Sequence, residues 1–135
     1  MSENVRSTAG LILVLLPTVI YGGVSLLRFI QKRDPGYVEN AVRQNLFRAG
    51  HAHAGVLLIF ALVGLLYLDE ADLGSGMESL VRICLVAAPI LMPAGFFFSV
   101  ASAKATKPNS LIALTYVGAL ALAVGTVTLG IGLLR

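Results

Sequence analysis

Both histidines of the chain lie within nine residues, Phe47-Arg48-Ala49-Gly50-His51-Ala52-His53-Ala54-Gly55. This stretch opens a long apolar segment that ends near Tyr67. Ionisable side chains are costly in the hydrocarbon region of a membrane and usually have a function there. Two imidazoles and an arginine among small residues therefore mark the stretch as the candidate site, and ligation of a metal is the chemistry that best suits an imidazole in apolar surroundings.

The spacing of the two histidines limits what they can bind together. Each residue of an α-helix turns the chain by about 100°, so side chains two positions apart point roughly 160° away from each other. His51 and His53 are therefore not expected to chelate one ion jointly. We expect one histidine per site, with His53 as the metal ligand and His51 as the weaker candidate.

The neighbours of His53 favour a flat ligand. Ala49 and Gly50 lie one turn before it, in the direction in which helical side chains lean, and leave room for a macrocycle. Haem with a histidine axial ligand suits such a place, and Arg48, or Arg43 or Lys107, is a candidate partner for its propionates. The predicted cofactor-binding residues are His53, His51, Arg48, Gly50 and Gly55.

A second interpretation needs no cofactor. A histidine near a helix start can hydrogen-bond across a helix bundle, and small neighbours are ordinary helix-packing residues in membranes. Arg48 can equally extend to the membrane surface as an anchor.

Composition indicates a membrane protein. Of 135 residues, 57% are hydrophobic and 13% are charged, whereas soluble domains carry about 25% charged residues. Four apolar stretches, about 9–30, 46–68, 80–103 and 110–134, are each near the ~20 residues that cross a bilayer as a helix. We predict an all-α fold, an integral membrane four-helix bundle that forms a single domain over residues 1–135.

Local signals refine this picture. Val38 to Leu46 has the pattern of a short amphipathic helix on the membrane surface. Asn109 or Ser110 is expected to cap the fourth spanning helix. Glycines of that helix are expected to allow close helix approach: Gly118, Gly125, Gly130 and Gly132.

Basic residues predict the orientation in the membrane. Seven Lys and Arg residues flank the first and third loops, against three on the other side, so those loops are expected to be cytoplasmic. We predict a multi-pass protein of the bacterial inner membrane. The net charge of +3 then reflects orientation in the lipid bilayer, and no nucleic-acid partner is expected.

Other sites have little support in the sequence. A single cysteine, Cys84, excludes an internal disulfide and a cysteine-based zinc or iron–sulfur site. Gly74-Ser75-Gly76 lacks the lysine of a phosphate-binding loop. No nucleophile–base pair and no carboxylate pair lies within a span, which disfavours hydrolases and proton-coupled carriers.

At these residues the chain resembles the four-helix membrane family of styrene oxide isomerase and hydroxylaminobenzene mutase. The matching element is Ala52-His53-Ala54-Gly55, with weaker matches at Pro35-Gly36-Tyr37, Gly95-Phe96-Phe97 and Pro108-Asn109. The resemblance implies a homo-oligomer, a trimer, that holds haem b between neighbouring subunits on His53. It also implies a ferric iron acting as a Lewis acid on a small apolar substrate such as an epoxide.

The chain departs from this family at two positions. Ile59 stands where the family has an asparagine, and Phe97 stands where the isomerase has a tyrosine. Tyr21 and Tyr116, both within spans, are candidate substitutes. Haem binding is therefore better supported than isomerase activity.

Three functions remain open from the sequence. One is a haem-dependent membrane isomerase or mutase, and the second is a non-catalytic haem or metal protein. The third is an accessory subunit of a larger membrane complex that carries no cofactor.

Overall fold

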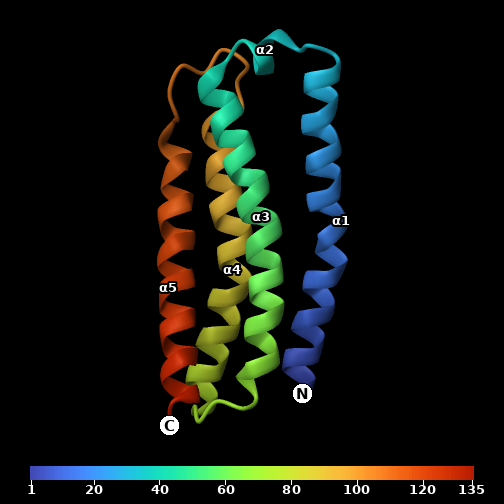
Figure 1. The fold of residues 1–135 in the computed structure, drawn as a ribbon. Helices are drawn as coiled ribbons and strands as arrows, with labels where there is room; N and C mark the ends of the chain where they lie inside the picture. The colour runs from blue at the N-terminus through green and yellow to red at the C-terminus, as the bar shows by residue number, and fades with distance from the viewer.

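The computed structural model describes all residues, 1–135, and contains helices but no strands. Four helices are long and apolar enough to cross a membrane, and they run up and down in turn, with both termini at the same end (Figure 1). The predicted all-α membrane four-helix bundle is thus confirmed. The elements are α1 (Glu3–Gln31), α2 (Pro35–Val38), α3 (Ala41–Leu68), α4 (Ser75–Ser99), the 3-10 helix η1 (Ser110–Ile112) and α5 (Ala113–Leu133).

The first loop differs from the prediction. No separate helix covers Val38 to Leu46, because α3 already begins at Ala41. Asn40 explains this start: its side-chain oxygen accepts from the backbone N–H of Arg43 at 3.0 Å, which caps the helix. At the other loop Asn109 accepts from the N–H of Leu111 at 2.8 Å, so the predicted cap before the last span is confirmed.

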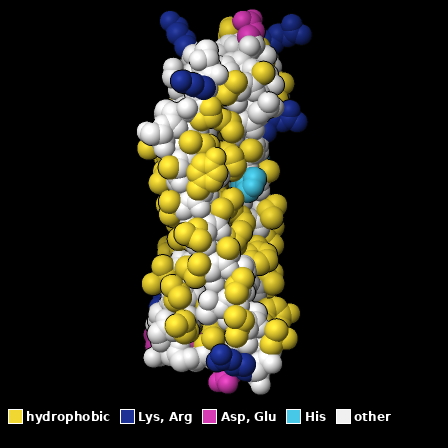
Figure 2. Space-filling view, turned by 90° about the vertical axis from the view of Figure 1, so that its left-hand side faces the viewer, with side chains coloured by type: hydrophobic (Ala, Val, Ile, Leu, Met, Phe, Trp, Pro, Cys, Tyr) yellow, Lys and Arg dark blue, Asp and Glu magenta, His cyan; other side chains and the backbone are white.

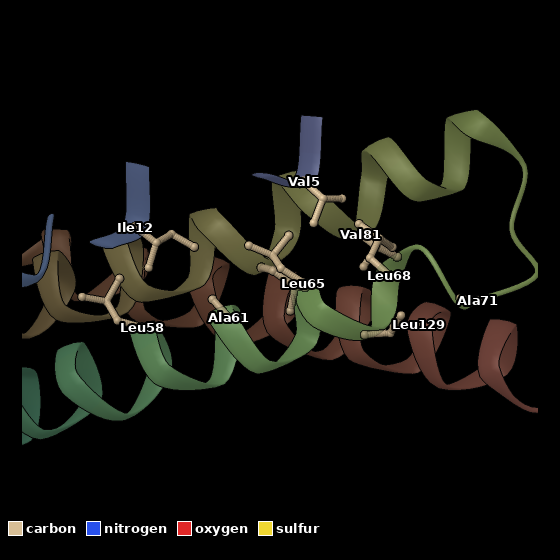
Figure 3. Packing of buried hydrophobic residues seen from close by; sticks show 10 residues of the cluster. Val5, Ile12, Leu58, Ala61, Leu65, Leu68, Ala71, Val81 and Leu129 are labelled. Atoms are coloured by element: carbon tan, nitrogen blue, oxygen red, sulfur yellow. The ribbon is translucent and has the colours of Figure 1, made fainter. Parts of the chain in front are cut away.

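The core lies where the N-terminal part of α1 meets the other helices. Figure 3 shows Val5 and Ile12 pointing from α1 toward Leu58 and Leu65 of α3. The buried residues of α1 are Val5, Thr8 and Ile12. Beyond Ile12 the helix buries no residue, although Leu26 and Phe29 pack partly buried against a second, smaller cluster that contains Tyr37.

Polar contacts hold that packed end of α1. The backbone N–H of Ser2 donates to the carboxylate of Asp69 at the end of α3, and the amino group of Met1 lies 3.4 Å from the same carboxylate. The hydrogen bond from Ser2 holds the pKa of Asp69 below its ordinary value. The start of α1 is thereby tied to the end of α3.

The outer surface suits lipid. Figure 2 shows, on the face turned to the viewer, mostly hydrophobic side chains and one His over the middle of the molecule, with Lys, Arg, Asp and Glu toward its two ends. An apolar belt between two polar ends is the distribution that a bilayer selects. Together with the four spanning helices, this makes the chain a multi-pass integral membrane protein.

Glycines bring α5 close to its neighbours. A Cβ at Gly118 would lie 2.8 Å from the backbone nitrogen of Met92 in α4, and one at Gly125 would lie 2.8 Å from the Cβ of Cys84. Gly132 similarly faces Leu73 and Ala71. Gly130 has nothing within 4 Å, so the prediction of close approach is wrong at that position, which faces away from the packed side.

Replacing Gly118 with alanine should therefore destabilise the bundle. The added methyl meets the backbone of α4, which cannot move as a flexible side chain would, and overpacking of this kind costs about 1–3 kcal/mol. Gly130→Ala gains the same helix propensity without the clash. Thermal unfolding in one detergent should place Gly118→Ala below the parent and Gly130→Ala at or above it. Equal midpoints for the two variants would contradict the packing described.

Arg43 ties the two loops at the α2 end together. Its guanidinium donates to the carbonyls of Gly36 at 3.0 Å and Val100 at 3.2 Å. It also lies over the ring of Phe47, 4.6 Å from the ring centroid. One half-buried cation thus joins the first loop, α3 and the end of α4.

Arg43→Ala should lower the free energy of unfolding by at least about 2 kcal/mol, because backbone carbonyls lose a charged donor. The exposed Lys107 in the third loop provides a matched control, since Lys107→Ala removes a charge without a comparable contact. Chemical denaturation of both variants in the same detergent measures the difference. A stability loss of the same size in both would mean that charge alone matters.

Candidate functional site

The two histidines project from different sides of α3, as the helical spacing predicted. His53 lies against Phe96 of α4, with ring centroids 5.0 Å apart. His51 lies against Gly22 and Gly23 of α1. Each imidazole therefore has its own surroundings, and no group of three His, Cys, Asp or Glu residues gathers around either ring.

His53 has one nitrogen held and the other free. Its Nδ1 lies 2.7 Å from the carbonyl oxygen of Ala49, one turn earlier in α3. A carbonyl can only accept, so Nδ1 carries the proton and Nε2 keeps its lone pair. The side chain is half-buried, and Phe96 braces one side of the ring. This is how a ligating histidine is commonly oriented, with the second nitrogen donating to a carbonyl.

A groove continues along the His53 side of α3. It encloses about 380 Å³ between α3 and α5. Val56 and Leu57, one turn beyond His53, form part of its wall, and the walls are almost wholly apolar. The groove lies within the size range of small-molecule sites. Its residues are Val56, Leu57, Phe60, Ala119, Leu122, Ala123 and Thr126.

His51 fills the narrow space between α3 and α1. A Cβ at Gly23 would lie 3.0 Å from its Nε2, and one at Gly22 would lie 3.6 Å from its Nδ1. Nδ1 is buried and has no hydrogen-bond partner. The absence of a side chain at Gly23 is what admits the ring, whereas the distance at Gly22 is an ordinary van der Waals contact.

Two cavities flank His51 where α1 stands away from the core. One, of about 340 Å³, extends toward Thr18, Pro89 and Pro93. The other, of about 530 Å³, extends toward the first loop and includes Arg48 and Tyr37 in its lining. His51 contributes to the lining of both, so it borders each of them.

The predicted cofactor-binding residues do not gather around one ring. Arg48 lines a cavity together with His51, and Gly55 faces Val19 of α1. On the other side, the space beside Gly50 is filled by Phe96 and Phe97, whose atoms would lie 3.1 Å from an added Cβ. The room expected there for a macrocycle is therefore used for packing between α3 and α4.

The other two candidate partners for haem propionates, Arg43 and Lys107, lie in or beside the loops. The guanidinium of Arg43 donates its hydrogen bonds to backbone carbonyls of the loops, and Lys107 is exposed in the third loop. Neither is brought to His53 by the contacts of the structure.

Polar groups that would act beside His53 are absent from the expected positions. Phe97 packs edge-on against Phe47, with centroids 5.3 Å apart, and it lines the cavity on the α1 side. Ile59 is exposed at the outer surface, as are Tyr21 and Tyr116. The immediate neighbour of His53 across the helix interface is the apolar ring of Phe96.

The structure adds two residues that the sequence reading missed, Gly22 and Gly23. Paired glycines in the middle of an apolar span are the signal that was available, because they imply close approach of another group to the helix. They accommodate the ring of His51. This contact depends on how α1 and α3 pair, so neither segment predicts it alone.

Comparison of the chain with protein-family models, curated proteins and solved structures finds no match. The resemblance to the styrene oxide isomerase family therefore stays a prediction.

The hydrogen bond of His53 makes a direct spectroscopic prediction. In the haem-free protein, nitrogen-15 NMR of labelled histidine should show the proton of His53 on Nδ1, because Ala49 offers only an acceptor. His53→Ala identifies the signal by its loss. A proton found on Nε2 would mean that the ring does not make this bond and is not set up as an Nε2 ligand.

Proposed function

We propose that this protein is a membrane haem-b protein in which His53 is the axial ligand of the iron. The observation that carries the proposal is the fixed imidazole: Nδ1 is engaged with the Ala49 carbonyl at 2.7 Å, and Nε2 is left as a free lone pair among apolar helices. A single histidine with its tautomer set in this way is one of the axial donors that proteins offer to haem iron.

The chemistry of the residues fits this cofactor better than it fits a bare ion. No cluster of three protein ligands exists in the chain, so a metal at His53 needs most of its ligands from elsewhere, and a porphyrin supplies four nitrogens. The apolar groove along the same side of α3 offers hydrophobic surface to a flat macrocycle. Gly50 does not contribute room, because Phe96 and Phe97 occupy it.

The half-buried position of His53 supports a shared site. One protomer covers only part of the ring, and the groove beside it lies open between α3 and α5. We propose that a neighbouring copy completes the site in a homo-oligomer, with a trimer as the form that the family resemblance implies. Arg48 faces the other side of α3, so any propionate partner at His53 comes from another element or another copy.

The activity proposed for the loaded protein is that of an isomerase or mutase. Bound ferric haem would supply a Lewis acid that polarises a C–O or N–O bond of a small apolar substrate. The chain's own residues hold the imidazole through Ala49 and exclude water with Phe96 and the apolar groove.

A specific observation favours a second candidate, a haem protein without this catalysis. The residue next to His53 is Phe96, and Phe97 and Ile59 are directed elsewhere. No hydroxyl or amide is thus available at the expected positions to orient a substrate.

We place the protein in the bacterial inner membrane, with the first and third loops in the cytoplasm. The excess of Lys and Arg beside those loops supports this orientation. His53 then lies near the cytoplasmic end of its span.

The test of haem binding compares variants of the two histidines. Protein purified in detergent and supplied with hemin should show a Soret band that is lost in His53→Ala, because the axial nitrogen is gone. His51→Leu should keep the band, since its ring faces α1. Loss of the band in His51→Leu alone would identify His51, on the other side of α3, as the axial ligand. Absence of any band in the parent would refute haem binding.

Turnover then separates the two candidates. The haem-loaded parent is incubated with styrene oxide and with N-phenylhydroxylamine, and rearranged product is quantified against free hemin in the same detergent. Product above the hemin background that disappears in His53→Ala supports the isomerase or mutase. A redox-active haem without product supports the non-catalytic protein.

A further inference from the structure

The cavity between α1 and the first loop is lined by two basic side chains that make no side-chain hydrogen bond or ion pair within the chain, the exposed Arg48 and the half-buried His51. It encloses about 530 Å³ and lies on the opposite side of α3 from His53. Arg48 and His51, one turn apart on α3, both line it. The remaining lining is mainly apolar and contains no carboxylate: Gly23, Leu26, Leu27, Ile30, Tyr37, Val38 and Gln44.

The surroundings of His51 determine which nitrogen faces this cavity as a donor. Nδ1 is buried without a partner on the Gly22 side. Buried N–H groups left without an acceptor are rarer than buried acceptors left without a donor, so the proton belongs on Nε2. Nε2 lies beside Gly23, a residue of the cavity wall. An N–H donor therefore lies at the wall of the cavity.

Arg48 supplies the charge. The one ion pair of the chain joins the N-terminal amino group to Asp69, so no carboxylate neutralises Arg48. Its guanidinium and the Nε2–H of His51 together suit an oxyanion, because charge-assisted hydrogen bonds to carboxylate or phosphate are among the strongest in proteins. Leu26, Leu27 and Ile30 of α1 extend from these donors as apolar surface.

We propose that this cavity binds the anionic head of an amphipathic molecule, a carboxylate or phosphate attached to an apolar chain. Arg48 pairs with the head, His51 donates to it through Nε2, and the apolar chain lies along the cavity side of α1. The site is separate from the proposed haem site, since it lies on the other side of α3.

Native mass spectrometry of delipidated protein in detergent tests the proposal. Dodecanoate and phosphatidylglycerol are titrated separately, with zwitterionic phosphatidylcholine as the reference. Arg48→Gln should weaken anion binding about tenfold and His51→Leu about threefold, as expected for the loss of a charged and of a neutral donor. Arg28→Gln removes a charge from the same end of α1 without lining the cavity and should bind as the parent does.

The two anions distinguish a membrane lipid from a free acid as the ligand. Binding of phosphatidylglycerol alone identifies a lipid headgroup, and binding of dodecanoate alone identifies a free amphipathic acid; both require the effects of Arg48→Gln and His51→Leu. Equal binding of phosphatidylcholine, or equal losses in Arg28→Gln and Arg48→Gln, would overturn the proposal. Arg48→Lys, which keeps the charge, should bind with intermediate strength and guards against misfolding of Arg48→Gln. His53→Ala should bind the anion normally even where haem is lost.

Discussion

The structure depends on how a bundle without water in its middle accommodates polar groups. In hydrocarbon every donor and acceptor needs a partner within the protein or a ligand. Several side-chain hydroxyls meet this need locally: those of Thr8, Ser25 and Thr126 donate to carbonyls of their own helices. The two imidazoles do not meet it fully, because each retains a nitrogen without a partner. That incomplete satisfaction is the physical reason to look for ligands at both.

Close approach of helices gives the bundle its uneven form. Glycines let α5 press against α4, and a hydrophobic cluster joins the start of α1 to α3. Further along α1, Gly23 makes room for the ring of His51, and a cavity lies on each side of this contact. Glycine thus permits both contacts: it lets α5 lie directly on α4, and it leaves space in α1 for the imidazole of His51.

Much of this architecture was predictable from the sequence because apolar length and turn residues are local properties. The four spans, the Asn109 cap and the roles of Gly118, Gly125 and Gly132 follow from such signals. The partition of the histidines to two sides also followed, since it needs only the helical repeat. Which helix each ring would face was not predictable, because this depends on the pairing of α1 with α3. For the same reason the sequence did not predict that phenylalanine rings of α4 fill the space beside Gly50. Nor did it predict that α3 begins at Ala41, a start that the hydrogen bonds from Asn40 to the third loop reinforce.

The placement of two imidazoles on one continuous helix has a mechanical consequence. Because α3 is one continuous helix from Ala41 to Leu68, a rotation of this helix about its long axis would move the rings of His51 and His53 in opposite lateral directions. Any displacement of α3 that changes the surroundings of one ring therefore changes those of the other, although the groove and the cavity have no lining residue in common.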